Sequence, residues 1–122
     1  MGSWSWEIET GLLTWSEELY NIFELENGHT LTFGQYLEFI HPNDSIRVKA
    51  EIDEASRTGS NHNSVCNIIT AKGRIRFVYA VSKPKKNNHS MITGFYGTCL
   101  DITHLPHLQN AVATQNTNEP LS

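Results

Sequence analysis

The stretch VCNIITAKGRIRFVYAVS, residues 65–82, decides the fold of this 122-residue chain. Residues 65–70 predict one strand and residues 74–82 a second, with turn chemistry between them at residues 71–73. In the second strand, apolar side chains recur at every second position, the period of a strand with one buried face: Ile75, Phe77, Tyr79 and Val81. The stretch therefore predicts an antiparallel hairpin.

Further strands are predicted on both sides of this hairpin. Residues 3–9 alternate polar and apolar side chains, residues 10–11 supply a turn, and residues 12–15 resume extended structure, so the chain opens with a second tight hairpin. The apolar face of its first strand is made of Trp4, Trp6 and Ile8. After a polar loop at residues 84–88, residues 91–102 are rich in β-branched and aromatic residues and predict a fifth strand.

Three helices are predicted between the two hairpins. Ser16 can cap the first helix, Thr32 the second, and either Asp44 or Ser45 the third, which ends before Gly59. Apolar residues recur at helical spacing after each cap: Leu19, Ile22 and Phe23; Phe33, Tyr36, Leu37 and Ile40; Ile46, Val48, Ile52 and Ala55. Hairpins at both ends with helices in the middle indicate an α+β domain whose helices cover one face of the sheet.

The composition limits the classes of function. With 39% hydrophobic and 18% charged residues, the chain has the balance of one globular domain, which we place at residues 1–103, and residues 104–122 are predicted to be a flexible linker or tail. A net charge of -4 offers no basic field for nucleic acid. No apolar run is long enough to cross a membrane and no signal peptide is evident, so we expect a cytoplasmic protein. Residues 1–3 are either a native start or a cloning remnant.

Five short motifs are spread over residues 3–103: Trp4-Ser-Trp-Glu-Ile-Glu-Thr-Gly11, Trp15-Ser-Glu-Glu-Leu-Tyr-Asn-Ile-Phe23, His41-Pro-Asn-Asp44, Gly73-Arg-Ile-Arg-Phe-Val78 and Gly97-Thr-Cys-Leu-Asp-Ile-Thr103. Together they resemble the PAS sensor family in the form that contains a PAC motif. Each motif is weak alone, but all five occur in the order and at the spacing of the family. The resemblance implies a five-stranded antiparallel sheet in the order 2-1-5-4-3, with helices across one face enclosing an apolar cavity.

The same resemblance separates the two cysteines. Cys66 would lie on the third strand and Cys99 on the fifth, with the fourth strand between them. Neighbouring strands are about 4.8 Å apart, so the two Cα atoms should be too distant for a disulfide. We expect two reduced, unreactive thiols.

The candidate ligand pocket is the helix-facing side of the sheet together with the inner faces of the helices. Its polar candidates are Asn67, Tyr36 and Tyr79, which could orient a small ligand among apolar neighbours. The full candidate set is Trp15, Phe23, Tyr36, Ile40, Ile52, Val65, Asn67, Phe77, Tyr79, Phe95 and Gly97. A specific ligand and a core packed shut both remain open for this region.

Neither haem nor flavin is expected, and the cofactor is left unknown. Haem-binding relatives place an axial His on the long helix, but residues 45–59 contain none. Flavin photoreceptor relatives carry a Cys in an Asn-Cys-Arg-Phe-Leu-type motif on the middle helices, whereas both cysteines here lie in predicted strands. His104 and His107 lack a third metal ligand nearby, and His41 fits a capping and packing role at the helix junction.

No catalytic arrangement is predicted. The acidic pairs Glu17/Glu18 and Asp53/Glu54 are sequence neighbours on helices, so their side chains point to different faces. No nucleophile can be matched with a base, and no glycine-rich phosphate loop is present. We expect a chain that is not an enzyme.

The resemblance makes residues 101–103, Asp-Ile-Thr, the exit point towards a downstream effector. Asp101 can pair with a basic residue of the preceding hairpin, with Arg76 the first choice and Arg74 the second. Signal output is therefore predicted at Asp101, Ile102, Thr103 and Arg76. Pro106 follows closely, so either an effector has been cut off after a short helix near residues 105–112 or this linker is not a signalling helix.

Two functions follow from these features. The first is a sensory module of a bacterial signalling protein, such as a sensor histidine kinase or diguanylate cyclase, that binds a small ligand or partner and relays the change. The second is a ligand-free interaction module that forms a homodimer through the exposed sheet face or the Trp4 strand.

Overall fold

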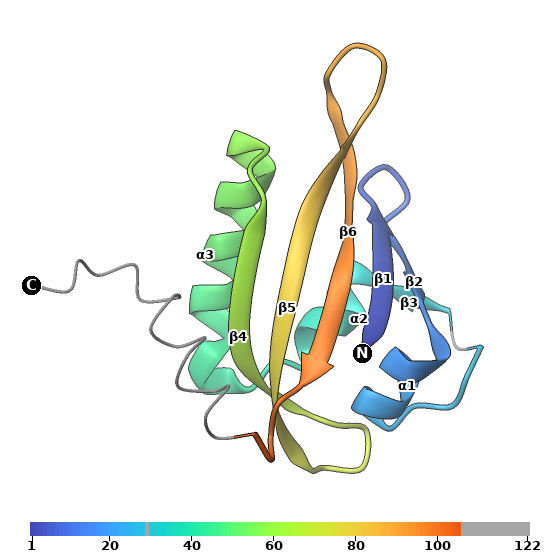
Figure 1. Ribbon diagram of the computed structural model, residues 1–122, viewed down its shortest axis with the longest axis vertical. Helices are drawn as coiled ribbons and strands as arrows, with labels where there is room; N and C mark the ends of the chain where they lie inside the picture. The colour runs from blue at the N-terminus through green and yellow to red at the C-terminus, as the bar shows by residue number, and fades with distance from the viewer. Residues whose placement is uncertain (29, 106–122) are drawn as a thin grey trace, which may run out of the picture.

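The computed structural model describes residues 1–28 and 30–105, which form an α+β domain as expected (Figure 1). Its helices and strands, in chain order, are β1 Gly2–Glu7, β2 Leu12–Trp15, α1 Glu17–Phe23, β3 Leu31–Thr32, α2 Phe33–Glu38, α3 Pro42–Thr58, β4 His62–Ile69, β5 Ile75–Lys86 and β6 Ile92–Asp101. The expectations for the linker, for a short helix near residues 105–112 and for His107 fall almost entirely on residues 106–122, outside the described part of the chain.

One antiparallel sheet runs in the order β3-β2-β1-β6-β5-β4. The expected order is confirmed for the five longer strands, but the count of five was one too low. The additional strand, β3, is only two residues long and pairs Leu31 with Leu13 and Thr32 with Leu12. Two residues cannot display a strand period, so no alternation pattern could have revealed it.

The helix starts follow the predicted caps in part. At the start of α2, Thr32 Oγ1 accepts a hydrogen bond from the backbone N–H of Gln35 at 3.2 Å, and the Gln35 side chain accepts from the Thr32 N–H, which completes a capping box. The prediction that Asp44 or Ser45 caps α3 was wrong, whereas the capping role expected of His41 is confirmed. Its cap is His41, whose Nδ1 accepts from the Asn43 N–H at 3.1 Å, while Asp44 Oδ2 instead accepts from the backbone N–H of Asn67 at 2.7 Å.

Strand β5 extends through Pro84, where a loop was expected. Strand β4 begins at His62, opposite Ser82, so the end of β5 beyond Ser82 pairs only with β6. A proline is tolerated on such a free edge because no neighbouring strand needs its missing N–H.

The helices all lie on one face of the sheet, with α3 beside β4 at one edge and α1 next to β1 and β2 at the other (Figure 1). The larger core lies between them and includes Leu19, Phe23, Cys66, Ile68 and Val78. A smaller cluster, centred on Val65 and Ile102 with Phe77, Tyr79 and Leu100, lies apart from it. Because strand side chains alternate, this smaller cluster belongs to the opposite face of the sheet.

The face assigned to β4 and β5 from the sequence was therefore wrong. Both faces of β5 are apolar, with Val78 and Ala80 on one and Phe77 and Tyr79 on the other. A period of two cannot choose between two apolar faces, and a choice that is wrong by one residue reverses every side chain. Among the described residues, no helix is long and apolar enough to cross a membrane.

Candidate functional site

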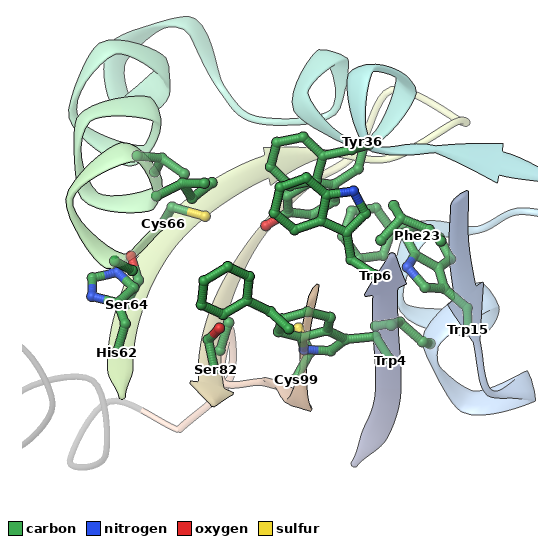
Figure 2. A pocket seen from close by; sticks show the side chains of 18 residues that line it. Trp4, Trp6, Trp15, Phe23, Tyr36, His62, Ser64, Cys66, Ser82 and Cys99 are labelled. Atoms are coloured by element: carbon green, nitrogen blue, oxygen red, sulfur yellow. The ribbon is translucent and has the colours of Figure 1, made fainter. Parts of the chain in front are cut away.

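A cavity of about 90 Å³ lies between the helices and the inner face of the sheet (Figure 2). By a measure in which one water needs about 10–15 Å³, this space corresponds to about six to nine water positions. Seven aromatic side chains from strands β1, β2 and β6 and helices α1 and α2 line it: Trp4, Trp6, Trp15, Phe23, Phe33, Tyr36 and Phe95. Val48, Ile52 and Ala55 of α3 complete the helical side.

Ring stacking holds the aromatic part of the wall in place. The Trp6 ring stacks on Phe33 at a centroid distance of 4.1 Å and on Phe95 at 5.8 Å, with interplanar angles of 17° and 15°. Trp15 and Phe23 lie 4.6 Å apart. Stacked and tilted aromatic pairs of this kind are favourable beyond the area they bury, so these rings restrain one another.

The polar groups of the wall come mainly from β4 and β5. Figure 2 shows His62, Ser64 and Cys66 on one side of the cavity and Trp6, Phe23 and Trp15 on the other. Ser82, Cys99 and Tyr36 complete the polar part. Among the described residues that line the cavity, none is Asp, Glu, Lys or Arg.

The thiols and the phenol of this wall stay protonated at neutral pH. Burial raises the pKa of Cys66 to about 12, with the Asp44 carboxylate adding to the effect. Burial likewise raises the pKa of Cys99 to about 12 and, together with the nearby Cys66 and Cys99, raises the pKa of Tyr36 well above its usual range. Since the thiolate is the nucleophile, neither cysteine is activated for chemistry.

The two cysteines are free and lie on strands separated by β5. Cys66 pairs with Val78 of β5, and Cys99 pairs with Ala80 on the other side of that strand. Two strand spacings place their Cα atoms about 10 Å apart, beyond the reach of a disulfide. The expected separation is confirmed.

Two buried nitrogens of the cavity wall have no hydrogen-bonding partner among the described residues: Trp6 Nε1 and His62 Nε2. The indole of Trp4 provides a contrast, because its Nε1 donates to the carbonyl oxygen of Thr98 at 3.3 Å. The closest carboxylate to His62 Nε2 is Glu51 Oε1, 3.8 Å away, which is too long for a hydrogen bond. A buried polar group without a partner is costly, so each nitrogen is a point where a ligand or solvent can bind.

The predicted pocket residues divide into two groups. Five line the cavity: Trp15, Phe23, Tyr36, Ile52 and Phe95. Of the other six, Val65, Phe77 and Tyr79 lie in the cluster on the opposite face, Ile40 is buried in the core, Asn67 donates its backbone N–H to Asp44, and Gly97 lies under the ring of Trp4. Ile40 and Gly97 are on the helix side without lining the cavity.

The sequence prediction missed Trp4 and Trp6, because the Trp4 strand was considered only as a place for dimer contacts. In the structure β1 lies between β2 and β6, and both indoles face the helices and line the cavity. The signal was present, because the alternation of residues 3–9 places both rings on one face of the strand. That face is the one continuous with Leu13 and Trp15 of β2.

An ionic network joins the end of α1 to the end of β6. Arg76 Nε lies 3.8 Å from Asp101 Oδ2, the pairing expected from the sequence, and Arg76 Nη2 lies 3.9 Å from Glu24 Oε1. Asp101 Oδ1 accepts from the Thr103 N–H at 3.0 Å, and Thr103 Oγ1 accepts from the Phe77 N–H at 2.9 Å. The exit segment is therefore bonded to β5 and, through Arg76, to α1.

Glu24 anchors this network at α1. Its carboxylate accepts a 2.7 Å hydrogen bond from Thr70 Oγ1, which lowers its pKa, and the nearby Arg74 and Arg76 lower it further. The backbone of Glu24 is left-handed, with φ at 57°, and caps the C-terminal end of α1. Arg74, the second choice for Asp101, pairs with Glu24 at 3.4 Å instead.

Comparison with known proteins identifies the family. The family model described as PAS fold matches residues 12–99. The chain belongs to the PAS family. The N-terminal domain of a diguanylate cyclase with PAS/PAC sensor from Marinobacter aquaeolei superposes with a TM-score of 0.80 at 16% identity, covering 87% of this chain and 97% of that one. A sensory box histidine kinase/response regulator from Burkholderia thailandensis gives a TM-score of 0.75 at 21% identity, covering 95% and 87%.

A curated relative of this PAS domain is the methyl sulfide methyltransferase-associated sensor of Methanosarcina acetivorans. It is 29% identical over 117 residues, which is 91% of this chain and 11% of the relative. The chain thus spans about a tenth of the relative's length. In the described part of the PAS domain, no three His, Cys, Asp or Glu side chains are placed to hold a metal ion.

Proposed function

We propose that this PAS domain is a cytoplasmic sensory module that binds a small molecule in its cavity and relays occupancy through Asp101 and Thr103 to an effector. The observation that carries this proposal is the cavity of about 90 Å³, bounded by aromatic rings on one side and by His62, Ser64 and Ser82 on the other. A small ligand site combines such an apolar wall with a few polar groups.

The relay starts at residues that touch the cavity. Phe23 lines the cavity, and the next residue, Glu24, is bonded to Thr70 and paired with Arg76. Arg76 in turn pairs with Asp101, so a ligand that displaces Phe23 shifts one end of a network whose other end is the exit segment. In a domain with two conformations that differ at Phe23 and Asp101, a ligand favours the conformation that it binds more tightly. The difference between its two affinities sets how far the equilibrium shifts.

The effector is proposed by analogy. The structural neighbours come from a diguanylate cyclase and from a histidine kinase/response regulator, and the curated relative is named a sensor. A histidine kinase or diguanylate cyclase in the same chain is therefore the output that we propose for the parent protein. The PAS domain itself would supply binding and relay rather than catalysis.

Native mass spectrometry of the chain purified from cells tests ligand binding. A retained ligand appears as added mass in the native spectrum that is lost in the denatured one. If the ligand dissociates during purification, adding an extract of small molecules from the producing cells to the purified chain supplies it again. An unchanged native mass after both steps would contradict the ligand-binding proposal.

A second function, homodimerisation without a ligand, is favoured by the opposite face of the sheet. Ile75 is 58% exposed and Tyr96 is 45% exposed on this face, beside Phe77, Tyr79 and Leu100. Size-exclusion chromatography with light scattering should then show a dimer that Tyr96→Glu converts to a monomer. A wild-type chain that stays monomeric at all accessible concentrations would exclude this function.

A further inference from the structure

We infer that the cavity selects an uncharged, compact ligand that carries a hydrogen-bond acceptor, such as a small ketone, and that Trp6 Nε1 donates to this acceptor. The inference rests on the proposed ligand-binding function and names the class of ligand. It is carried by the lack of Asp, Glu, Lys and Arg among the described lining residues, by the size of the cavity, and by the contrast between the unpartnered Trp6 N–H and the bonded Trp4 N–H.

The absence of permanently charged side chains among the described lining residues argues against a charged ligand. Among the described residues, no Asp, Glu, Lys or Arg lines the cavity, and the thiols and phenol that do are neutral at pH 7 because burial raises their pKa values. Glu51, which contacts Ser64 of this wall, is already bonded to Arg47 and Ser64 at 2.9 Å. A ligand carboxylate or phosphate would therefore lose its hydration without finding a permanently charged counter-ion among these residues.

The unpartnered N–H of Trp6 defines the polar group of the ligand. An indole nitrogen can only donate, and Trp6 Nε1 is buried with no acceptor among the described residues. Stacking on Phe33 and Phe95 fixes the ring, so the N–H cannot turn to find another partner. A carbonyl or ether oxygen of a ligand would remove this cost, whereas a hydrocarbon would leave it in place.

The cavity size limits the ligand to a compact molecule. About six to nine water positions accommodate a five- or six-membered ring with one substituent. Cyclohexanone and methylcyclohexane are suitable probes, because they have the same number of non-hydrogen atoms and differ in the presence of an acceptor. Cyclopentanecarboxylate adds a charged probe of similar size.

Binding of the three probes to the whole chain should be measured by calorimetry for the wild type, Trp6→Phe and Trp4→Phe. Trp6→Phe removes the free N–H and keeps an aromatic ring. It should therefore lower the affinity for cyclohexanone about tenfold and the affinity for methylcyclohexane less than twofold. Trp4→Phe is the matched control, since Trp4 lines the same cavity but its N–H is already bonded to Thr98. Trp4→Phe should change the affinities for cyclohexanone and methylcyclohexane by the same factor.

A second measurement does not depend on any variant. In the ¹⁵N–¹H spectrum of the wild type, the Trp6 indole cross-peak should move downfield in the proton dimension when cyclohexanone binds and should not do so with methylcyclohexane. The Trp6→Phe spectrum, or a Trp6-selective label if that variant does not fold, assigns the peak.

The outcomes separate the inference from the function on which it rests. Equal binding of cyclohexanone and methylcyclohexane, with no selective effect of Trp6→Phe, would overturn the inference and leave ligand binding standing. Tight binding of cyclopentanecarboxylate would overturn the uncharged class. If none of the probes binds at millimolar concentration and native mass spectrometry shows no retained ligand, both the inference and the proposed function fail.

Discussion

Replacing Ala80 by valine tests whether the cavity in the folded protein is unfilled and can accept additional carbon atoms. Ala80 lies on β5 between Ser64 of β4 and Cys99 of β6, and all three side chains line the cavity. Valine adds two methyl groups on the cavity side of the sheet. At about 0.8 kcal/mol for each buried carbon, the substitution should raise the free energy of unfolding by at most about 1.6 kcal/mol, or the melting temperature by about 5 °C.

Val78→Ile is the matched control for this prediction. Val78 lies two residues earlier on the same strand and face, is 2% exposed and does not line the cavity. One added carbon in this packed region should lower the free energy of unfolding by about 1–3 kcal/mol. Denaturant titration of both variants measures the two changes, whose signs should be opposite. If Ala80→Val destabilises the domain as much as Val78→Ile does, the space is already filled and the reasoning fails.

Three further predictions concern the exit network, the thiols and one glycine. Asp101→Ala should abolish regulation in the parent protein while lowering the free energy of unfolding by about 1–3 kcal/mol, since it removes the partly exposed ion pair with Arg76 and the hydrogen bond from the Thr103 N–H; unchanged regulation would count against the relay. Burial raises the thiol pKa values from 9.0 to about 12, so stability is fully present below about pH 9 and should fall as pH rises, by up to about 1.4 kcal/mol per pH unit per thiol. Unfolding titrations at pH 8 and pH 10 should show a smaller loss for a Cys66→Ala/Cys99→Ala variant, and an equal loss would contradict the assigned burial. Gly97→Ala should prevent folding, judged by circular dichroism, because a Cβ there would overlap the Val81 carbonyl oxygen; a cooperatively melting variant would refute this contact.

Much of the fold follows from local patterns that act over a few residues. The two-residue alternation around Trp4 and the capping box at Thr32 each specify one element, and the structure confirms both elements. Leu31–Thr32 escaped prediction because its pairing with β2 depends on tertiary contact. The extension of β5 through Pro84 was not predicted, because a proline is tolerated there only where β4 no longer pairs with β5.

The candidate site was less predictable than the fold. Phe23 and Tyr36 could be placed in the wall because helical spacing directs them to the sheet, whereas Phe77 and Tyr79 lie on the opposite face because β5 is apolar on both faces. The volume of a cavity depends on small residues such as Ala80 and on how the surrounding rings stack, which no single pattern records. The pairing of Arg76 with Asp101 could be predicted because both residues lie on adjacent strands near the same end of the sheet.

The most direct test of the account follows the Thr103 amide while the cavity is filled. The Thr103 N–H donates to Asp101 Oδ1, so its ¹⁵N–¹H cross-peak reports on the exit segment. When cyclohexanone saturates the cavity, the account predicts that this cross-peak shifts in the wild type and that Arg76→Gln suppresses the shift. Spectral changes confined to residues that line the cavity, with the Thr103 cross-peak unmoved, would contradict the claim that cavity occupancy is relayed to the exit.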